Sequence, residues 1–573
     1  MSNSLFRTKN IDKIIKDAAT LEESGHGGSL KRVLTLKDLT FFGIAAIIGA
    51  GSFSSLGEAC YKGGPGVVIL FIICAIACGF TALCYAEFAS RIPVAGSAYT
   101  YAYASFGELF AWIIGWALIM EYSIGNIYVA FSWSDYFTSF LSRVGLHVPD
   151  YLTCSYMEAH QAVAEAAAKP AELITSSTAE LLNAWNNAPV IGSLRIIFDL
   201  PALVINTLIT ILVYVGIKES RNFSNVMVIL KLCIIVLVIA VGAYYVNPDN
   251  WTPVTSTGVH SFLPNGFSGV MRAVSGVFFA YIGFDAISVM AEESRNPQRD
   301  LPRSMILSLV ICTVVYILLT LVLTGVISYE KFNNVGDPLA KIFEDTHVGW
   351  MQFLVSLAAV IAMTSVLLVF QMGQPRIWMS MSRDGLLPTV FQRIHPKFHT
   401  PSFSTIITGL IVGVPILFTD KVFVLDFTSI ATLFAFVLVC GGVLLIPRKE
   451  KVAGKFNMPY INGKFIFPLL IILAVIILAF ANPHYFSDLF DINADNASLN
   501  ISTIILWVVL VILSVASFLK SLSLIPLLGL STCLYLLTGM TGKNWAWFSS
   551  WLLLGLIVYF MYGYRKSKLR PVA

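Results

Sequence analysis

Charged residues are scarce in this chain of 573 residues. They make up 12% of it, whereas hydrophobic residues make up 57%, and the mean hydropathy is +0.78. Soluble domains carry about 25% charged residues, so this composition indicates a polytopic membrane protein. The net charge of +4 comes from basic loops that suit lipid headgroups, and nothing resembles a nucleic-acid-binding face.

Several patterns that carry chemistry are missing. The nine cysteines form no CxxC pair, and most lie in apolar runs, as expected of small packing residues. The eight histidines fall in loops or termini, so we expect neither a metal nor another cofactor. No Walker loop for nucleotide phosphates is present, and the polar residues 1–38 lack the pattern of a cleaved signal peptide. A membrane enzyme and an ATP-driven pump are therefore disfavoured.

Long apolar runs dominate the rest of the chain. About 20 apolar residues span a bilayer, and we predict an all-α membrane protein of about fourteen transmembrane helices. The runs are 39–62, 66–90, 107–141, 193–216, 221–246, 267–293, 303–329, 349–383, 402–419, 421–446, 465–481, 501–519, 523–541 and 544–564.

Lysine and arginine are distributed unevenly between the loops. With the N-terminus inside, cytoplasmic segments hold 27 of the 37 and outer loops hold seven, while Arg195, Lys231 and Arg272 fall within predicted helices. Because positive loops stay cytoplasmic, we predict a multi-pass plasma (inner) membrane protein with both termini cytoplasmic. The outer segment 142–192 is rich in Ala and Glu and predicts a small helical cap. A solvated surface helix without a role in transport is the favoured interpretation of that cap.

Two predicted helices contain residues that favour an interruption. The first holds GIAAIIGAGSFSSLG (43–57), and the sixth holds SGVFFAYIGFDAISVMAEESRNPQRDLP (275–302), with Gly283 beside Asp285 at mid-membrane depth. Small residues also allow close helix packing, but each of these helices opens a set of five. This arrangement predicts two inverted five-helix repeats, 39–246 and 267–446, followed by four peripheral helices in 465–564 and a tail at 565–573.

An interrupted backbone is costly in lipid and persists only where it faces protein or a water-filled cavity. The N–H groups of Gly49 to Ser52 would lie at the positive end of a half-helix and suit a carboxylate. The carbonyl groups of Phe279, Ala280 and Ile282 would suit an ammonium group. Together these groups match the two ends of a free α-amino acid.

The sequence of these blocks resembles the amino acid–polyamine–organocation superfamily of transporters, and most closely its cationic amino acid transporter branch. The resemblance includes IIGAGSFSSLGE, CYAEFASRIPVAGSAYTYAY, GWALIMEYSIG, the 275–302 block, QPRIWMSMSRDGLLP and SIATLFAFVLVC, in family order over about 400 residues. It implies a ten-helix core with alternating access around a midplane site. Relative to twelve-helix members, 465–481 and 501–519 look like an added hairpin.

The resemblance also implies roles for particular residues. The carboxylate-binding bend corresponds to Ile48, Gly49, Ala50, Gly51 and Ser52; the amine-binding carbonyls correspond to Phe279, Ala280 and Ile282; and the aromatic that closes over the substrate corresponds to Phe284. The eighth helix would line the side-chain end through Met363, Thr364, Ser365 and Val366. Thr and Ser at such places also bond back to their own helix.

Lys231 lies about ten residues into the fifth predicted helix, roughly 15 Å deep at 1.5 Å per residue. An ionisable group at this depth is a functional candidate, because burial disfavours a charged amine and lets it exchange a proton near neutral pH. Proton-coupled members of the family place a lysine here, which implies that Lys231 couples proton movement to transport. The alternative is a static role, in which Lys231 bonds the carbonyls of the unwound first helix.

Glu121, in WALIMEYSIG, is equally deep in the third predicted helix. It resembles an acidic residue of the cationic branch that could face a substrate's ammonium or guanidinium group, and a structural hydrogen bond to a neighbouring helix is the alternative. The charged residues at the inner ends of helices 2 and 6, including Glu87, Arg91, Arg295 and Arg299, could form an inner gate or be solvated helix ends.

The sequence thus predicts a secondary active transporter of neutral or cationic L-amino acids, with the proton as the coupling ion and the lipid bilayer as its surroundings. Obligate exchange, sodium coupling and an amino-acid sensor without flux are the alternatives. The oligomeric state cannot be deduced from the sequence.

Overall fold

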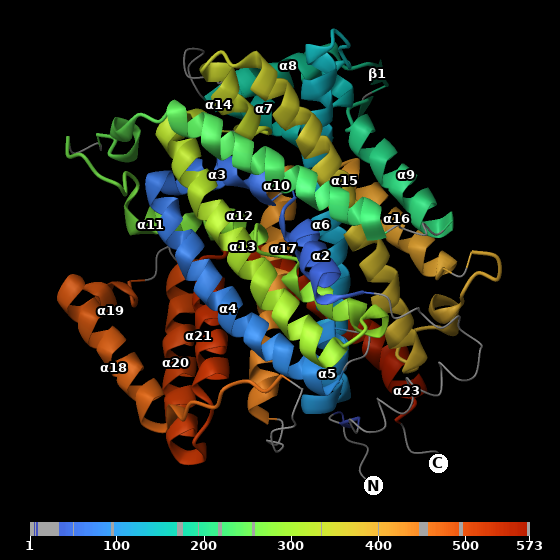
Figure 1. The fold of residues 1–573 in the computed structure, drawn as a ribbon, viewed down its shortest axis with the longest axis vertical. Coiled ribbons are helices and arrows are strands. Elements are labelled where there is room, and N and C mark those ends of the chain that lie inside the picture. Colours follow the sequence, from blue (N-terminus) through green and yellow to red (C-terminus); the bar gives the residue numbers. More distant parts are fainter. Residues whose placement is uncertain are drawn as a thin grey trace.

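The computed structural model describes residues 5, 7–9, 34–49, 51–92, 97–168, 176–192, 194–215, 221–254, 258–333, 335–398, 400–445, 456–491 and 497–569. This part of the chain is mostly helical, and it contains one short antiparallel ribbon, in which β1 (Val190–Ile191) pairs with β2 (Leu194–Arg195). The helices form a single bundle (Figure 1).

The first five apolar runs contain two interrupted or short helices and three long ones. Their elements are α2 (Leu36–Ile47), η1 (Gly51–Ser55) and α3 (Leu56–Gly63); η2 (Gly64–Gly66) and α4 (Val67–Arg91); α5 (Ser97–Ser105) and α6 (Glu108–Arg143); α9 (Leu200–Val215); and α10 (Arg221–Tyr244). Helix α2 begins where the Asp38 carboxylate accepts hydrogen bonds from the N–H and hydroxyl of Thr35, at 2.9 and 2.6 Å, which satisfies a free donor at the helix start.

The second group of runs also begins with an interrupted helix. Its elements are η5 (Pro248–Trp251), α11 (Gly266–Arg272), α12 (Val274–Phe279) and η6 (Phe284–Glu293); α13 (Pro297–Val326); η7 (Tyr329–Phe332) and α14 (Pro338–Asp345); α15 (Gly349–Arg383); η8 (Thr389–Gln392) and α16 (Ser402–Ile416); and α17 (Lys421–Leu445). Helices α6 and α15 run for 36 and 35 residues without interruption.

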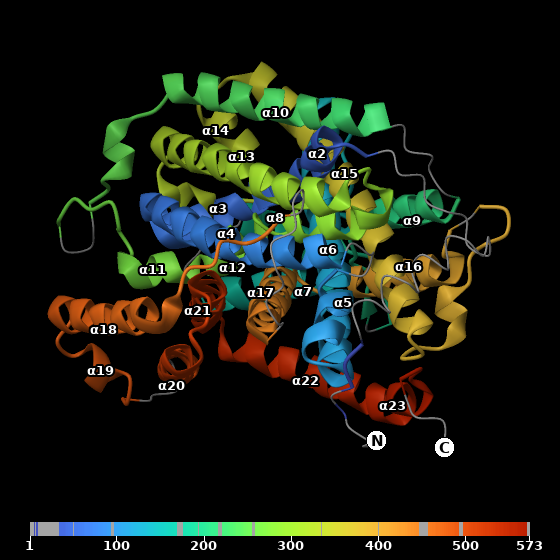
Figure 2. The ribbon, with the colours of Figure 1, turned by 60° about the horizontal axis from the view of Figure 1, so that its bottom comes forward.

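The C-terminal helices lie beside this core. They are α18 (Gly463–Ala481), α19 (Tyr485–Asp488), α20 (Ala497–Lys520), α21 (Leu524–Thr538), α22 (Gly542–Val558), η9 (Tyr559–Gly563) and α23 (Tyr564–Lys566). Figure 2 shows α18, α19 and α20 grouped at one side of the molecule, while α21 packs against α17 and α4.

Burial separates central from peripheral helices. In α6, 89% of the most apolar window is buried, against 11% in α18. Accordingly α6 packs against α15 and α17 in the middle of the bundle, whereas the apolar side chains of α18 face outward, as expected of a helix surrounded by lipid.

Among the described residues, nine helices are long and apolar enough to cross a membrane, or ten if the bent pair α11 and α12 counts as one span. Helices α9, α16 and α21 are apolar but shorter. A membrane protein is therefore supported, while the number of fourteen spans and the two inverted repeats of five remain predictions.

The predicted helix 193–216 begins later than expected. Asp199 accepts a hydrogen bond from the N–H of Ala202 at 2.9 Å and so caps α9 at Leu200. Arg195 is consequently not within a helix. It lies in β2, where its guanidinium donates to the Trp185 carbonyl at 2.6 Å and lies over the Trp185 ring.

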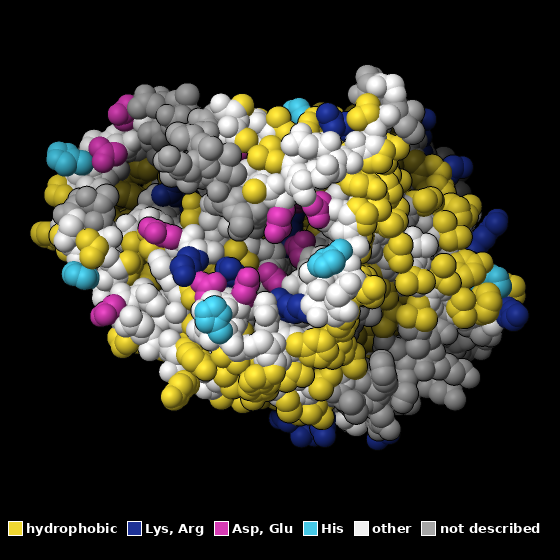
Figure 3. Space-filling model, turned by 90° about the horizontal axis from the view of Figure 1, so that it is seen from above, with side chains coloured by type: hydrophobic (Ala, Val, Ile, Leu, Met, Phe, Trp, Pro, Cys, Tyr) yellow, Lys and Arg dark blue, Asp and Glu magenta, His cyan; other side chains and the backbone are white. Residues whose placement is uncertain are grey.

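The described residues of segment 142–192, called the cap below, include η3 (Asp150–Leu152), α7 (Tyr156–Ala168) and α8 (Ser176–Asn187). Together with α14 the cap lies at one end of the bundle, opposite α5 and α23 (Figure 1). Viewed from that end, acidic and basic side chains gather near the middle, and hydrophobic side chains occupy the flanks (Figure 3).

The two ends of the described chain meet at α6. Glu108 donates its backbone N–H to the Arg7 carbonyl at 2.9 Å and accepts a hydrogen bond from the Tyr559 hydroxyl at 3.0 Å. The described N- and C-terminal residues therefore lie on the same side of the molecule, away from the cap.

Candidate substrate and coupling site

The first interruption lies between α2 and α3. Helix α2 ends at Ile47, Ile48 is extended, and a π-helical turn over Gly51–Ser55 precedes α3. The N–H groups of Ser52 and Phe53 both donate to the Gly49 carbonyl at 3.0 Å. Ala50 lies outside the described residues. Two of the N–H groups near this bend therefore already have a partner in the chain.

Two glycines let this segment approach its neighbours. A Cβ on Gly49 would lie 2.3 Å from the Val366 side chain of α15, and one on Gly51 would lie 2.5 Å from the Ala280 backbone. The Ser55 hydroxyl also bonds the Gly276 carbonyl at 2.9 Å. The first interruption thus packs directly against the second at Gly51, where a larger residue would separate them, whereas a larger residue at Gly49 would meet Val366 of α15.

The second interruption follows α12. Two tight turns carry the chain past Phe279, with Tyr281 N–H donating to the Phe278 carbonyl and Ile282 N–H to the Phe279 carbonyl. Gly283 then adopts a left-handed conformation at φ 118°, and a 3₁₀ helix begins at Phe284. A Cβ on Gly283 would lie 2.9 Å from the Ala46 backbone. Both its conformation and its surroundings therefore require glycine.

Tyr316 of α13 joins the two interruptions. Its hydroxyl lies 3.0 Å from the Ile47 carbonyl oxygen and 2.8 Å from the Ala280 carbonyl oxygen. Two carbonyls predicted to bind an amine, those of Phe279 and Ala280, therefore already have a partner in the chain, although a carbonyl oxygen keeps a second lone pair. Sequence reasoning did not identify Tyr316, because a single tyrosine in an apolar run has no distinguishing pattern.

Lys231 lies against the first interrupted helix. Its side chain is 1% exposed, and the Nζ lies 3.2 Å from the Ala45 carbonyl oxygen and 3.1 Å from the Ile48 carbonyl oxygen. Helix α10 packs against both α2 and α15. The amine is thus positioned where its charge acts directly on the last turn of α2.

Two buried carboxylates face a common region beneath the interruptions. Glu121 of α6 and Asp285 of η6 are 3% and 1% exposed, and each has one carboxylate oxygen without a hydrogen-bond partner in the described part of the chain. Both interact electrostatically with Tyr85 and Tyr122. Sequence reasoning noted Asp285 only for its place beside Gly283, and the structure adds its proximity to Glu121.

The aromatic residues around the second interruption point in different directions. The Phe284 ring packs on Tyr85 and Phe436, with centroids 6.0 and 5.1 Å apart. The Phe279 ring meets Tyr128 of α6 edge to face at 4.6 Å. Phe279 and Tyr128 therefore cover the interruption on one side, while Phe284 belongs to the cluster near the buried carboxylates.

The predicted residues of the eighth helix fall on α15 and divide into two groups. Met363 and Val366 are buried, with Val366 against Gly49. Thr364 and Ser365 bond back to the carbonyls of Val360 and Ala362 at 2.7 Å. Thr364 also accepts a hydrogen bond from the Trp133 indole at 2.9 Å. The Thr364 and Ser365 hydroxyls therefore serve structural contacts.

Charged residues join α17, α6 and α7 at the end of the bundle that carries the cap. The Lys421 ammonium contacts the Asp135 carboxylate of α6 and lies 5.6 Å from the centre of the Tyr128 ring. Its backbone N–H donates to Glu158 of α7 at 3.2 Å, and burial raises the pKa of Glu158. This series of contacts links the cap to Tyr128, which covers Phe279.

The end of the bundle opposite the cap has fewer cross-helix ion pairs in the described residues. Arg295 and Arg299 are exposed. Glu87 pairs with Arg91 one turn away on α4 and accepts a hydrogen bond from Met458 N–H at 2.8 Å. The positions of Arg295 and Arg299 fit solvated helix ends.

Comparison with known proteins identifies the class to which this arrangement belongs. A model of the amino acid permease family matches residues 34–513, and a model of the C-terminus of such permeases matches residues 522–567. The chain belongs to the amino acid permease family, within the amino acid–polyamine–organocation superfamily, and it is a transporter rather than an enzyme.

Two bacterial relatives match nearly the whole chain. The branched-chain amino acid permease BcaP of Bacillus subtilis is 37% identical over 99% of this chain and 100% of its own length. The methylthioribose transporter of the same organism is 34% identical over 99% of both chains. The vacuolar cationic amino acid transporter 4 of Arabidopsis thaliana is 33% identical over 78% of this chain and 67% of its own length.

Proposed function

We propose that the protein is a proton-coupled symporter of L-amino acids that works by alternating access. Its substrate would lie where the two interrupted helices meet, with its carboxylate at the residue 48–52 bend and its amine at the carbonyls of Phe279, Ala280 and Ile282. The close approach of Gly51 to the Ala280 backbone supports this placement, because it brings the two interruptions into direct contact.

The position of Lys231 is the observation that carries the proposal of proton coupling. Its Nζ lies between the Ala45 and Ile48 carbonyl oxygens, at 3.2 and 3.1 Å. When the amine is protonated it draws these carbonyls together, and when it loses the proton that attraction weakens. A proton taken up by Lys231 would therefore stabilise the end of α2 that binds the substrate carboxylate.

The substrate class is proposed to include neutral amino acids, cationic amino acids or both. The names of two relatives favour branched-chain and cationic amino acids, while the second bacterial relative is named as a transporter of methylthioribose. The paired carboxylates Glu121 and Asp285 support a cationic side chain. A thermal-shift screen of the purified protein against the twenty amino acids and methylthioribose would identify the ligand, because binding to the native state raises its apparent stability.

The location is proposed to be the plasma membrane, with both termini on the cytoplasmic side and the cap outside. The uneven distribution of Lys and Arg and the common position of residues 7–9 and α23 support this orientation.

Reconstituted vesicles test the mechanism. Uptake driven by an inward proton gradient without internal amino acid is expected for a symporter. Uptake only when amino acid is present inside would instead establish an obligate exchanger, in which Lys231 serves as a static hydrogen-bond donor. Ligand binding without either flux would indicate a sensor.

A further inference from the structure

Four buried polar side chains converge beneath the second interruption, and we call them the polar cluster. They are Glu121 and Tyr122 of α6, Tyr85 of α4 and Asp285 of η6. In the described part of the chain, each has an oxygen that is shielded from the surface and lacks a hydrogen-bond partner. Tyr85 interacts electrostatically with the other three, so side chains from three separate elements meet in one place.

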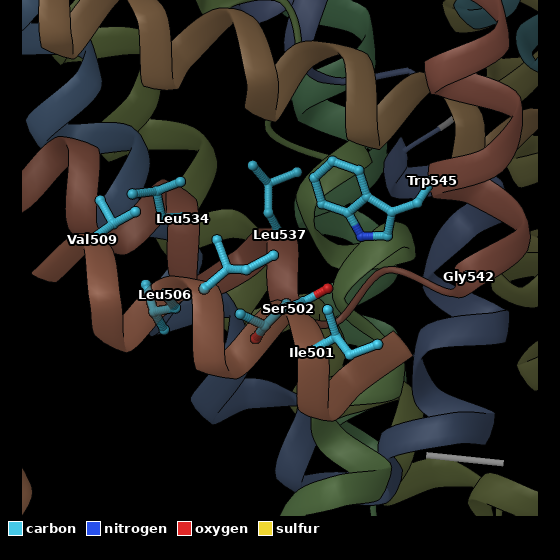
Figure 4. A pocket seen from close by; sticks show the side chains of 10 residues that line it. Ile501, Ser502, Leu506, Val509, Leu534, Leu537, Gly542 and Trp545 are labelled. Carbon is cyan, nitrogen blue, oxygen red and sulfur yellow. The ribbon is translucent and has the colours of Figure 1, made fainter. Parts of the chain in front are cut away.

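The groove between the C-terminal helices has the opposite character. It is lined by α20, α21 and the start of α22, mostly with apolar side chains, and its lining includes no ionisable group (Figure 4). A charged ligand would find no partner there. Ionisable groups buried within a membrane protein mark substrate and ion pathways, and the polar cluster contains two of them.

No cation balances the two carboxylates of the polar cluster. Within the described chain, the groups that act on Glu121 are Asp285 and the Thr432 hydroxyl of α17, and the groups that act on Asp285 are backbone groups at the start of η6. Arg376 of α15 acts on Tyr122. The titratable and charged groups around the pair are Cys78, Tyr85, Tyr101, Tyr122 and Arg376.

Two neighbouring carboxyl groups buried in this way do not both stay ionised. Burying an unpaired carboxylate is so costly that the group takes up a proton instead, and of two carboxyl groups in one site one keeps its proton. Backbone groups of Gly283 and Ala286 hydrogen-bond to the Asp285 carboxylate, and the start of a helix favours negative charge. Asp285 is therefore the anion of the pair, and Glu121 is the group that holds the proton.

We propose that Glu121 keeps its proton beside a neutral substrate and releases it to solution when a cationic side chain binds between Glu121 and Asp285. This inference rests on the proposed function, in which an amino acid lies where the interrupted helices meet. With a neutral side chain, the pair carries one negative charge, on Asp285. With a cationic side chain, both carboxylates are ionised and the ligand adds one positive charge, so the net charge is the same. One site can thereby accept both classes of amino acid.

Arginine and citrulline provide the test, because they are similar in shape and differ in charge. The guanidinium of arginine stays protonated, whereas the urea group of citrulline is neutral. Binding of each to the purified full-length protein is measured by isothermal titration calorimetry at pH 6, in buffers of different ionisation enthalpy, which gives the number of protons released. Arginine should release about one proton more than citrulline. Equal release would overturn the proposal.

Two variants locate the proton. E121Q keeps the shape of the side chain but cannot ionise, so the difference between arginine and citrulline should disappear. D426N is the matched control, because Asp426 is a carboxylate of the spanning helix α17 that accepts a hydrogen bond from the Asn544 amide at 3.0 Å. It should keep the full difference. A difference that persists in E121Q would assign the proton to another group and contradict the role of Glu121.

The pH dependence of affinity provides a second test that needs no variant, should E121Q unfold. A ligand whose binding releases one proton binds about tenfold more tightly for each unit of pH increase. The ratio of arginine affinity to citrulline affinity should therefore rise about tenfold between pH 5.5 and pH 6.5. Taking the ratio cancels any effect of Lys231 that both ligands share. A constant ratio would contradict the proposal.

The same titrations separate this inference from the proposed function. Binding of alanine or citrulline without any binding of arginine would overturn the inference and leave amino acid transport in place. Binding of no amino acid would overturn both.

Discussion

The Nζ of Lys231 lies 3.1 Å from the carbonyl oxygen of Ile48, the first residue after α2 ends. This contact joins α10 to the interruption of the first helix, across 183 residues of sequence. It places a buried amine beside the backbone that is proposed to hold the substrate carboxylate, and so it offers a direct physical route from a protonation event to substrate binding.

Replacing Lys231 with Met should separate coupling from binding. Met keeps the apolar stem but cannot carry a proton, so uptake driven by a proton gradient should fall by at least about tenfold, equivalent to about 1.4 kcal/mol. Exchange between internal and external amino acid should persist. Both activities can be measured in the same vesicles with a labelled amino acid. Gradient-driven uptake equal to that of the unaltered protein would exclude Lys231 as the coupling group.

Replacing either buried carboxylate should reveal the substrate's charge. If Glu121 and Asp285 hold a cationic side chain, E121Q and D285N should weaken lysine or arginine binding more than about tenfold, since losing one partner of a buried charge pair costs about 2–5 kcal/mol. Alanine binding should change little. The comparison uses binding of each amino acid to purified variants. An unchanged preference between lysine and alanine would assign both carboxylates to structural contacts.

Lys421 should hold the outer side closed. In K421M the Asp135 carboxylate loses its cation, and the attraction between the Lys421 ammonium and the Tyr128 ring is lost. Outward-open molecules should therefore become more frequent. A cysteine introduced at Phe279 should then react several-fold faster with a membrane-impermeant maleimide added from outside, because the labelling rate is proportional to the fraction of outward-open molecules. K341M is the matched control, because Lys341 pairs with Glu344 and Asp345 within the outer helix α14. A rate equal to that of the K341M protein would show that the outer side closes without Lys421.

Asp337 should make stability depend on pH. Burial raises the pKa of Asp337 from 3.8 to about 6, although the Ser139 hydroxyl and Arg143 oppose the shift. The folded state therefore binds a proton more readily than the unfolded state, and stability should fall as the pH rises from about 4 to about 6. The D337N protein should lose less thermal stability between pH 5 and pH 7.5 than the unaltered protein.

Asp345 provides the control for this measurement. Its ion pairs with Lys331 and Lys341 lower its pKa despite partial burial, so it is ionised in both states throughout the same interval. D345N should therefore show the same loss of thermal stability between pH 5 and pH 7.5 as the unaltered protein. Identical pH profiles for the D337N protein and the unaltered protein would contradict the assignment to Asp337.

The sequence by itself determined the class of protein and much of its local structure. The apolar runs contain the long helices, and 349–383 coincides with α15, because hydrophobic length is a local property that a bilayer constrains directly. The stretch 48–51, with two glycines, and the stretch 280–283, which ends at Gly283, mark the points where α2 and α12 end. The burial of Lys231 followed from its position in an apolar run.

Only the tertiary structure decided which of these groups meet. Tyr316 bridges carbonyls that are 36 and 269 residues away in sequence, and no local pattern distinguishes it from a packing residue. Asp285 is brought near Glu121 by the packing of η6 within the bundle, and Thr364 is bonded by Trp133 of another helix. These contacts depend on how helices cross, which the periodicity of a single segment does not specify.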